Sequence, residues 1–268
     1  ACFCGKITLV FASLFPLASV DPQRAETWLR ASLSAVWIWT ALAVLHPYYR
    51  LVGDSYLHAL SLPSLLMYLT CAAELGLGIV VLVVRPVRWL VSLQAALVLS
   101  FSLILALKEP LLLASPFGML SKNLQFLCVL YVLFLVEKHG SWTDLAKRYL
   151  RIGMAVVWLT EGLFPKLLFQ QQIELQMVPR IGIEQISPSI LVGAMGVAQI
   201  LSAVLALVLS GKWLRLLLLL QAGALLLLPL LVGFLEPSLY VHPFGPFSKN
   251  LPIFVGTLVV RKQCGGLS

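Results

Sequence analysis

Glu161 is the most conspicuous charged residue of the sequence, because it lies inside an apolar run, Trp158-Leu-Thr-Glu-Gly-Leu-Phe-Pro-Lys166. A charged side chain at membrane depth costs about 3 kcal/mol on insertion scales, so Glu161 is a candidate for ligand binding or proton exchange. Pro165 has no N–H and leaves the carbonyl of Glu161, four residues earlier, without its helical donor. Lys166 follows about one turn above and is the nearest candidate partner for the carboxylate. An ion pair that fixes helix packing explains this pattern equally well.

A repeated loop supplies a second group of candidates. Pro-Phe-Gly is followed by Ser-Lys-Asn at residues 116–123 and again at residues 243–250. Proline and glycine favour a tight loop, and the serine is typical of a helix N-cap. The lysine then opposes the dipole of the helix that it begins, a cost that a polar or acidic partner commonly offsets. Candidate partners are a lipid phosphate, a quinone-like carbonyl or, in a structural salt bridge, the carboxylates of Glu74, Glu109, Glu161 and Glu236.

These two stretches together predict one ligand pocket, formed by Glu161, Lys166, Ser248, Lys249 and Asn250. In it Lys249 and Asn250 donate hydrogen bonds to a quinone carbonyl or a lipid head group, and Glu161 orients Lys166 or exchanges a proton. Further polar residues within apolar segments form secondary sites, for which hydrogen bonding between helices is the plainer explanation. They are Glu74, Gln94, Lys122, Asn123, Gln199 and Gln221.

Other kinds of site are not indicated. The histidines show no metal-ligand spacing, and the sequence contains no nucleophile elbow, phosphate-binding glycine loop or metal motif. None of the five cysteines forms a C-x-x-C pair, which argues against a thiol relay. We therefore expect no metal and no covalently bound cofactor, and we assign no catalytic residue.

The elements that position these residues must be helices in lipid. The chain of 268 residues is 60% hydrophobic and 11% charged, with a mean hydropathy of +0.96. Soluble domains carry roughly a quarter charged residues, so the composition excludes a soluble enzyme and a nucleic-acid-binding module. Breaks at proline, glycine and charged residues delimit eight predicted membrane spans. Their ranges are 24–46, 63–84, 88–107, 121–136, 145–165, 188–210, 212–235 and 248–261.

The distribution of basic residues predicts the orientation of these spans. With eight spans, both termini lie on the side of the even-numbered loops, and that side holds most of the 19 Lys and Arg residues. The positive-inside rule then places both termini in the cytoplasm. Residues 7–19 form a further apolar stretch that is too short to cross at about 1.5 Å per residue. We interpret it as an interfacial segment.

The sequence also contains an internal duplication. Four motifs recur at a constant separation of 127 positions, among them Gln94-Ala95, which returns as Gln221-Ala222. Further upstream the separation is 121 for Trp37 and Trp158 and 125 for Glu74 and Gln199. The divisions that follow are an N-terminal segment 1–20, a first repeat 21–138, a second repeat 141–262 and a tail 263–268.

The expected fold is therefore an all-α, polytopic membrane protein with eight transmembrane helices in two four-helix bundles. Because each repeat holds an even number of spans, the second enters the membrane in the same direction as the first. Each repeat alone has the pattern of a four-helix bundle.

The second half resembles the DoxX-like family of small four-helix membrane proteins. The resemblance rests on Trp158-Leu-Thr-Glu-Gly-Leu-Phe-Pro-Lys-Leu167 and, two helices later, on His242-Pro-Phe-Gly-Pro-Phe-Ser-Lys-Asn-Leu-Pro252. The first half departs from this pattern, because Thr40 stands in the place of Glu161 and no lysine matches Lys166. The resemblance implies that the family site survives in the second half and that the first half serves as scaffold.

Members of this family include a subunit of a thiosulfate:quinone oxidoreductase, and others occur beside or fused to short-chain-dehydrogenase-like domains. The resemblance therefore implies a multi-pass protein of the prokaryotic inner membrane that is associated with redox chemistry. We expect an accessory subunit with a quinone- or lipid-binding pocket near the outer leaflet, lipid contacts, protein partners in a membrane complex and no nucleic acid. A purely structural assembly subunit and a small-molecule transporter are the alternatives.

Overall fold

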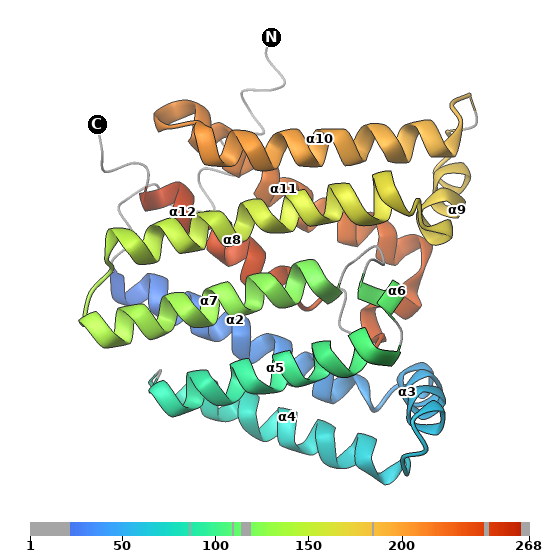
Figure 1. The fold of residues 1–268 in the computed structure, drawn as a ribbon, viewed down its shortest axis with the longest axis horizontal. Helices are drawn as coiled ribbons and strands as arrows, with labels where there is room; N and C mark the ends of the chain where they lie inside the picture. The colour runs from blue at the N-terminus through green and yellow to red at the C-terminus, as the bar shows by residue number, and fades with distance from the viewer. Residues whose placement is uncertain are drawn as a thin grey trace.

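The computed structural model describes residues 22–85, 87–108, 110–113, 119–183, 185–243 and 247–263, and all regular elements in these ranges are helical. Figure 1 shows long helices that run side by side, with short helices at one end. The predicted interfacial segment 7–19 and the predicted tail lie outside the described residues or at their margin.

Each predicted span corresponds to a helix whose ends differ from the prediction by a few residues. The first half contains α2 (Pro22–Ala43), α3 (Pro47–Ala59), α4 (Leu65–Val83), α5 (Arg88–Lys108), α6 (Pro110–Leu113) and α7 (Met119–His139). The second half contains α8 (Asp144–Gly162), a π-helical turn η1 (Leu163–Leu168), α9 (Gln172–Arg180), α10 (Pro188–Val208), α11 (Gly211–Leu235), a 3₁₀ turn η2 (Pro237–Val241) and α12 (Asn250–Gln263).

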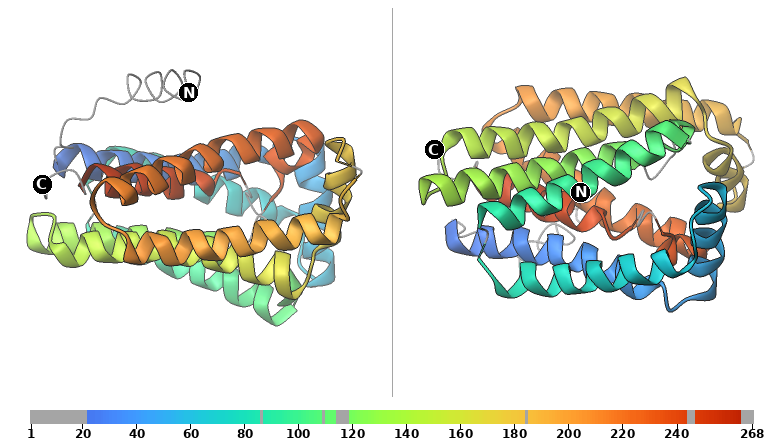
Figure 2. Two further views of the ribbon diagram at one scale, coloured as in Figure 1. Left: turned by 90° about the horizontal axis from the view of Figure 1, so that it is seen from above. Right: turned by 60° about the horizontal axis from the view of Figure 1, so that its bottom comes forward.

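Two short helices that the sequence analysis did not predict lie across one end of the molecule. The chain turns by 88° between α2 and α3 and again by 88° between α8 with η1 and α9. At the first turn His46 caps α3 by accepting the N–H of Tyr48 on its side chain, and Pro47 begins the helix. Figure 2 shows α3 and α9 at the same end in both views, as the duplication requires.

The last long helix of each half packs against the other half. Within each half α2 packs on α4 and α8 on α10, and α5 packs on α7 and α11 on α12. Between the halves α7 packs on α8 (Figure 1), and α12 packs on α2 and on α7. Within its own half α7 has only slight contact with α2, whereas α12 also packs on α8. The fold is therefore one helical body rather than two bundles that merely lie next to each other.

Four helices of the described chain are long and apolar enough to cross a membrane. They are α4, α7 from Leu120, α10 and α11, and the total rises to six if each bent pair counts as one span. The number of such helices is therefore smaller than the eight predicted spans. One reason is that α12 has 14 residues and at about 1.5 Å per residue is shorter than the ~30 Å hydrocarbon core.

Repeated arginines bind the free carbonyls at the ends of α4 and α10. The last four carbonyls of a helix have no partner within it, and the negative end of its dipole attracts a cation. In the first half Nη2 of Arg30 donates to the carbonyl of Val84 at 2.6 Å. In the second half Nε of Arg151 donates to the carbonyl of Ala206 at 2.6 Å, and Nη2 donates to Leu209. The arginines thus anchor the first helix of each repeat to the second.

We expect Arg151→Ala to lower the free energy of unfolding by about 2 kcal/mol, because it removes charge-assisted hydrogen bonds to two carbonyls. The measurement is the thermal midpoint of the purified protein in detergent. Arg148→Ala is the matched control, since Arg148 is exposed on the same helix. Equal midpoints for the two variants would show that the arginine contacts do not hold α10 in place.

Candidate functional site

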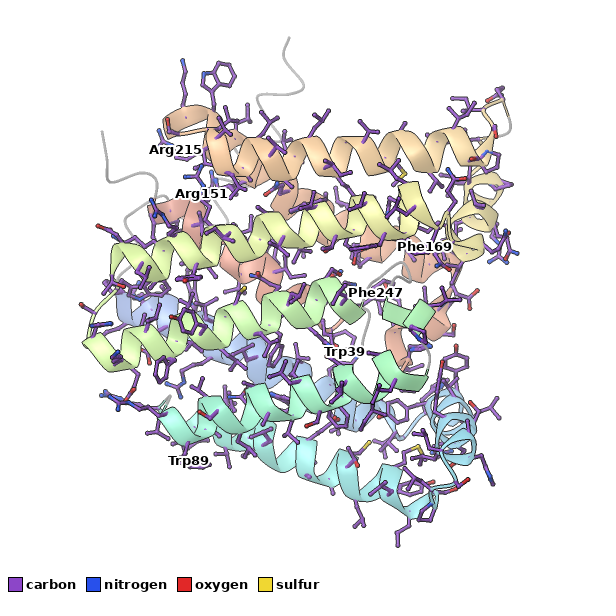
Figure 3. The ribbon with its side chains drawn as sticks, viewed as in Figure 1. Trp39, Trp89, Arg151, Phe169, Arg215 and Phe247 are labelled. Carbon is purple, nitrogen blue, oxygen red and sulfur yellow. The ribbon has the colours of Figure 1, made fainter. Side chains whose placement is uncertain are left out.

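A cavity of about 180 Å³ lies between α8, α9, α10 and α11 in the second half. Its wall is mainly leucine, valine, isoleucine and methionine side chains, as is usual for sites that bind small molecules. A few polar residues also line it: Lys122, Trp158, Glu161, Lys166, Glu174, Gln199 and Asn250. Figure 3 shows Phe169 and Phe247 on the side of the molecule away from Arg151 and Arg215, and Phe247 lines the cavity.

Glu161 is held by residues from the first half. The hydroxyl of Ser121 donates to Oε1 of Glu161 at 2.5 Å. Lys122 is buried, with 4% of its surface exposed, and lies within electrostatic reach of the same carboxylate. Ser121 was predicted to be a helix N-cap, but α7 begins at Met119 and Ser121 lies inside its first turn. The start of α7 is therefore a wall of a site that belongs mainly to the other half.

Pro165 changes the helix geometry beside Glu161. The helix continues beyond Gly162 as the π-helical turn η1, a form that often occurs at functional sites. The expected free carbonyl of Glu161 is satisfied by Lys166, whose Nζ donates to it at 3.3 Å. Lys166 is therefore bent back toward the residues that precede the proline.

The carboxylate that pairs with Lys166 is Glu174, not Glu161 as the sequence analysis expected. Nζ of Lys166 lies 2.7 Å from Oε1 of Glu174, and the two side chains are only 5% and 12% exposed. Glu174 comes from α9, which was not predicted as a helix. The ion pair ties α9 to η1 at the end of the cavity.

Lys249 points away from the cavity and toward the first half. Its Nζ donates to Oδ1 of Asn123 at 2.8 Å, and Nδ2 of Asn123 donates to Ser102 at 2.9 Å. Glu74 lies within electrostatic reach of Lys249. Among the described residues that line the cavity, Asn250 is present, whereas Lys249 and Ser248 are not.

The two lysines of the repeated motif are thus exchanged between the halves. Lys122 from the first half faces Glu161 of the second, and Lys249 from the second half faces Glu74 of the first. The exchange follows from the packing of α7 on α8 and of α12 on α2. The predicted pocket therefore contains Lys122, a residue that the sequence analysis had assigned to a secondary site, in the place of Lys249.

The glutamines of the two halves form hydrogen bonds between helices with different partners. Oε1 of Gln94 accepts the indole N–H of Trp37 at 2.9 Å. Its repeat mate Gln221 instead donates to the hydroxyl of Ser202 at 2.7 Å. Gln199 contributes to the wall of the cavity. The secondary positions are therefore divided between helix packing and the cavity.

Close approach of α8 and α10 brings this site together. A Cβ atom added to Gly162 would lie 2.5 Å from the carbonyl oxygen of Gly196, and one on Gly196 would lie 2.8 Å from that of Gly162. No real Cβ atom tolerates such distances, so both positions require glycine. The crossing is of the small-residue type that membrane helices use.

Metal binding has no support in the part of the chain that the structure describes, where no group of three or more His, Cys, Asp or Glu side chains is arranged around one point. His242 follows η2 at the end of the molecule, and burial lowers its pKa to about 4. Its imidazole is therefore neutral at neutral pH, and it packs beside Tyr48.

Two segments of the chain, residues 34–131 and residues 155–258, each match the DoxX-like family. The chain belongs to this family. The two matches show that the DoxX-like unit is present in tandem, and together they cover well over half of the chain. No curated protein and no solved structure matches the sequence.

Membership in the DoxX-like family and the apolar helices identify a multi-pass membrane protein, from a family loosely linked to redox and quinone-associated roles. The cavity draws on both DoxX-like segments, since Glu161 and Asn250 lie in the second and Lys122 lies in the first. The site thus depends on both units of the tandem.

Proposed function

We propose that this DoxX-like protein is an accessory membrane subunit of a quinone-linked redox assembly and that its cavity binds the ring of a quinone-type lipid. The observation that carries the proposal is a largely apolar cavity with a small set of buried charged groups at one end. Lys122, Lys166 and Asn250 offer donors to a ligand oxygen, and Glu161 holds the position of the lysines or exchanges a proton with the ligand.

The size of the cavity supports a ring-shaped ligand. Its volume is about 180 Å³, and an apolar protein cavity of about 150 Å³ is known to hold benzene. A single substituted ring therefore fits, whereas a bulky hydrophilic substrate does not. The apolar remainder of the wall favours a hydrocarbon tail.

The position of the cavity supports entry from the membrane. Four residues of its wall are also exposed on the outer surface of the protein, with 38–46% of their area accessible: Ile181, Met195, Leu228 and Leu231. These side chains lie on α10, on α11 and beside α9, where the surrounding phase is lipid. A quinone dissolved in the bilayer would reach the polar end without crossing water.

The proposal includes a membrane orientation. Arg151 and Arg215 lie at the end of the fold away from Phe247, which lines the cavity (Figure 3), and the positive-inside rule assigns the arginine-rich end to the cytoplasm. We infer eight crossings in two parallel repeats, both termini in the cytoplasm of a prokaryotic inner membrane, and a cavity near the outer leaflet. Reagents that label the two membrane faces test this orientation.

The test of the proposed function is calorimetric titration of ubiquinone-1 into the protein in nanodiscs. We expect saturable binding to the parent and about tenfold weaker binding to Glu161→Gln, a loss of about 1.4 kcal/mol. This substitution removes the charge beside Lys122 but keeps an acceptor for Ser121. Glu137→Gln is the control, because Glu137 pairs with Arg88 at an exposed position on another part of α7. Failure of the parent to bind would refute the quinone site and favour a purely structural subunit.

A further inference from the structure

Trp158 differs from its repeat mate in the partner of its indole N–H. In the first half Nε1 of Trp37 donates to Gln94 at 2.9 Å. In the second half, within the residues that the structure describes, Nε1 of Trp158 has no hydrogen-bond partner, although Trp158 is only 7% exposed. A buried donor without a partner costs about 1–3 kcal/mol, so the difference calls for an explanation.

The difference coincides with a different residue on α10. Gln221, the repeat mate of Gln94, donates to the hydroxyl of Ser202 and not toward Trp158. At the separation of 125 positions that relates Glu74 to Gln199, the first-half counterpart of Ser202 is Leu77. Leu77 has no polar group and packs in the same apolar cluster as Trp37. In the first half Oε1 of Gln94 therefore accepts from the tryptophan, whereas in the second half Nε2 of Gln221 is held by Ser202 and its Oε1 has no partner within the described residues.

Trp158 also lies at the right place to contact a ligand. It lines the cavity and precedes Glu161 by three residues, so the two side chains lie one turn apart on the same face of α8. The cavity thus has two polar points along one wall: the charged group of Glu161, Lys122 and Lys166, and the indole N–H. Apolar side chains such as Leu225 and Val192 complete the wall around them.

We infer that Trp158 is a ligand-positioning residue, whose N–H donates to a second oxygen of the bound ring while the charged group binds the first. This inference rests on the proposed quinone site and narrows its ligand to a ring with oxygens at opposite edges, a para-quinone. A lipid head group presents its polar atoms at one end only and offers no acceptor for Trp158.

Two probes of the same ring size test the inference by calorimetry in nanodiscs: ubiquinone-1 and a phenol with the same prenyl tail and a single oxygen. We expect Trp158→Phe to weaken ubiquinone-1 binding by about fivefold to tenfold, the worth of one hydrogen bond, and to leave phenol binding unchanged. Trp37→Phe is the matched control, since it removes the corresponding N–H from the first half, and it is expected to bind both probes like the parent.

A second variant tests the cause without changing the cavity wall. Ser202 does not line the cavity, and Ser202→Leu restores the first-half residue and removes the hydroxyl that holds Nε2 of Gln221. The Oε1 of Gln221, which has no partner within the described residues, can then turn toward the N–H of Trp158. We expect it to weaken ubiquinone-1 binding as much as Trp158→Phe does. Unchanged binding of ubiquinone-1 by both variants would overturn the role of Trp158 and leave the quinone site intact. No binding of ubiquinone-1 by the parent would overturn both.

Discussion

Replacement of Gly162 by leucine is expected to destabilise the protein by about 3 kcal/mol and to abolish binding in the cavity. Forced overpacking of a tight contact costs about 1–3 kcal/mol, and the upper part of that range applies because the obstacle is backbone. The carbonyl of Gly196 cannot rotate away as a side chain does. α8 and α10 must therefore separate, and both helices contribute side chains to the wall of the cavity. The thermal midpoint in detergent and the ubiquinone-1 titration measure the two effects.

Gly76→Leu provides the control for this substitution. Gly76 is also a glycine within a membrane helix, but it is exposed, and a Cβ atom there meets nothing within 4 Å among the described atoms. The loss of backbone freedom in the unfolded state is the same at both positions, so only the crossing distinguishes them. A Gly162→Leu protein as stable as Gly76→Leu would show that α8 and α10 do not approach as closely as the structure indicates.

The sequence was sufficient to predict the helices that correspond to the eight expected spans, and the duplication, but not the short helices α3 and α9. The apolar runs and their breaks at proline, glycine and charge locate all eight long helices, because burial in lipid leaves few other solutions for the backbone. The constant separation of the repeated motifs, such as Gln94 and Gln221, relates the two halves even where the hydrogen-bond partners of the paired residues differ. The functional importance of Glu161 stays a prediction; the structure places Glu161 in the wall of the cavity.

The exchange between the halves could not be predicted in this way. Lys122 and Lys249 occupy identical motifs, so nothing local tells which of them faces Glu161. The answer lies in the packing of α7 on α8, and α7 is apolar around most of its surface and has no distinct buried face to indicate its neighbour. Contacts between helices of the two halves determine which of the two lysines lines the cavity.

Glu174 was missed for a different reason. It lies on α9, a helix of nine residues in a polar segment that hydropathy alone marks as a loop between spans. Its amphipathic character is the signal that could have revealed it: Met177 and Val178 are buried, whereas Arg180 is exposed. Pro165 indicated only that the predicted helix 145–165 ended there, whereas the chain continues through η1 before it turns into α9.

Lys166→Met is expected to lower the free energy of unfolding by about 3–5 kcal/mol, because it leaves the buried carboxylate of Glu174 without its partner. The same change in an exposed pair should have no such cost. Lys147 lies 3.0 Å from Asp144, with 42% and 99% of the two side chains exposed, so Lys147→Met should leave the thermal midpoint unchanged.

The double variant Lys166→Met with Glu174→Leu separates the cost of an unpaired charge from the worth of the pair. Apolar residues of similar volume often replace a buried ion pair without loss, so the double variant should recover most of the stability that Lys166→Met loses. Binding should not recover, because Lys166 faces the proposed ligand as well as Glu174. Hydrogen exchange in α9 would show increased opening in the single variant alone. If the double variant bound ubiquinone-1 as the parent does, Lys166 and Glu174 would serve only to hold α9 against η1, and the ligand would depend on Lys122 and Asn250.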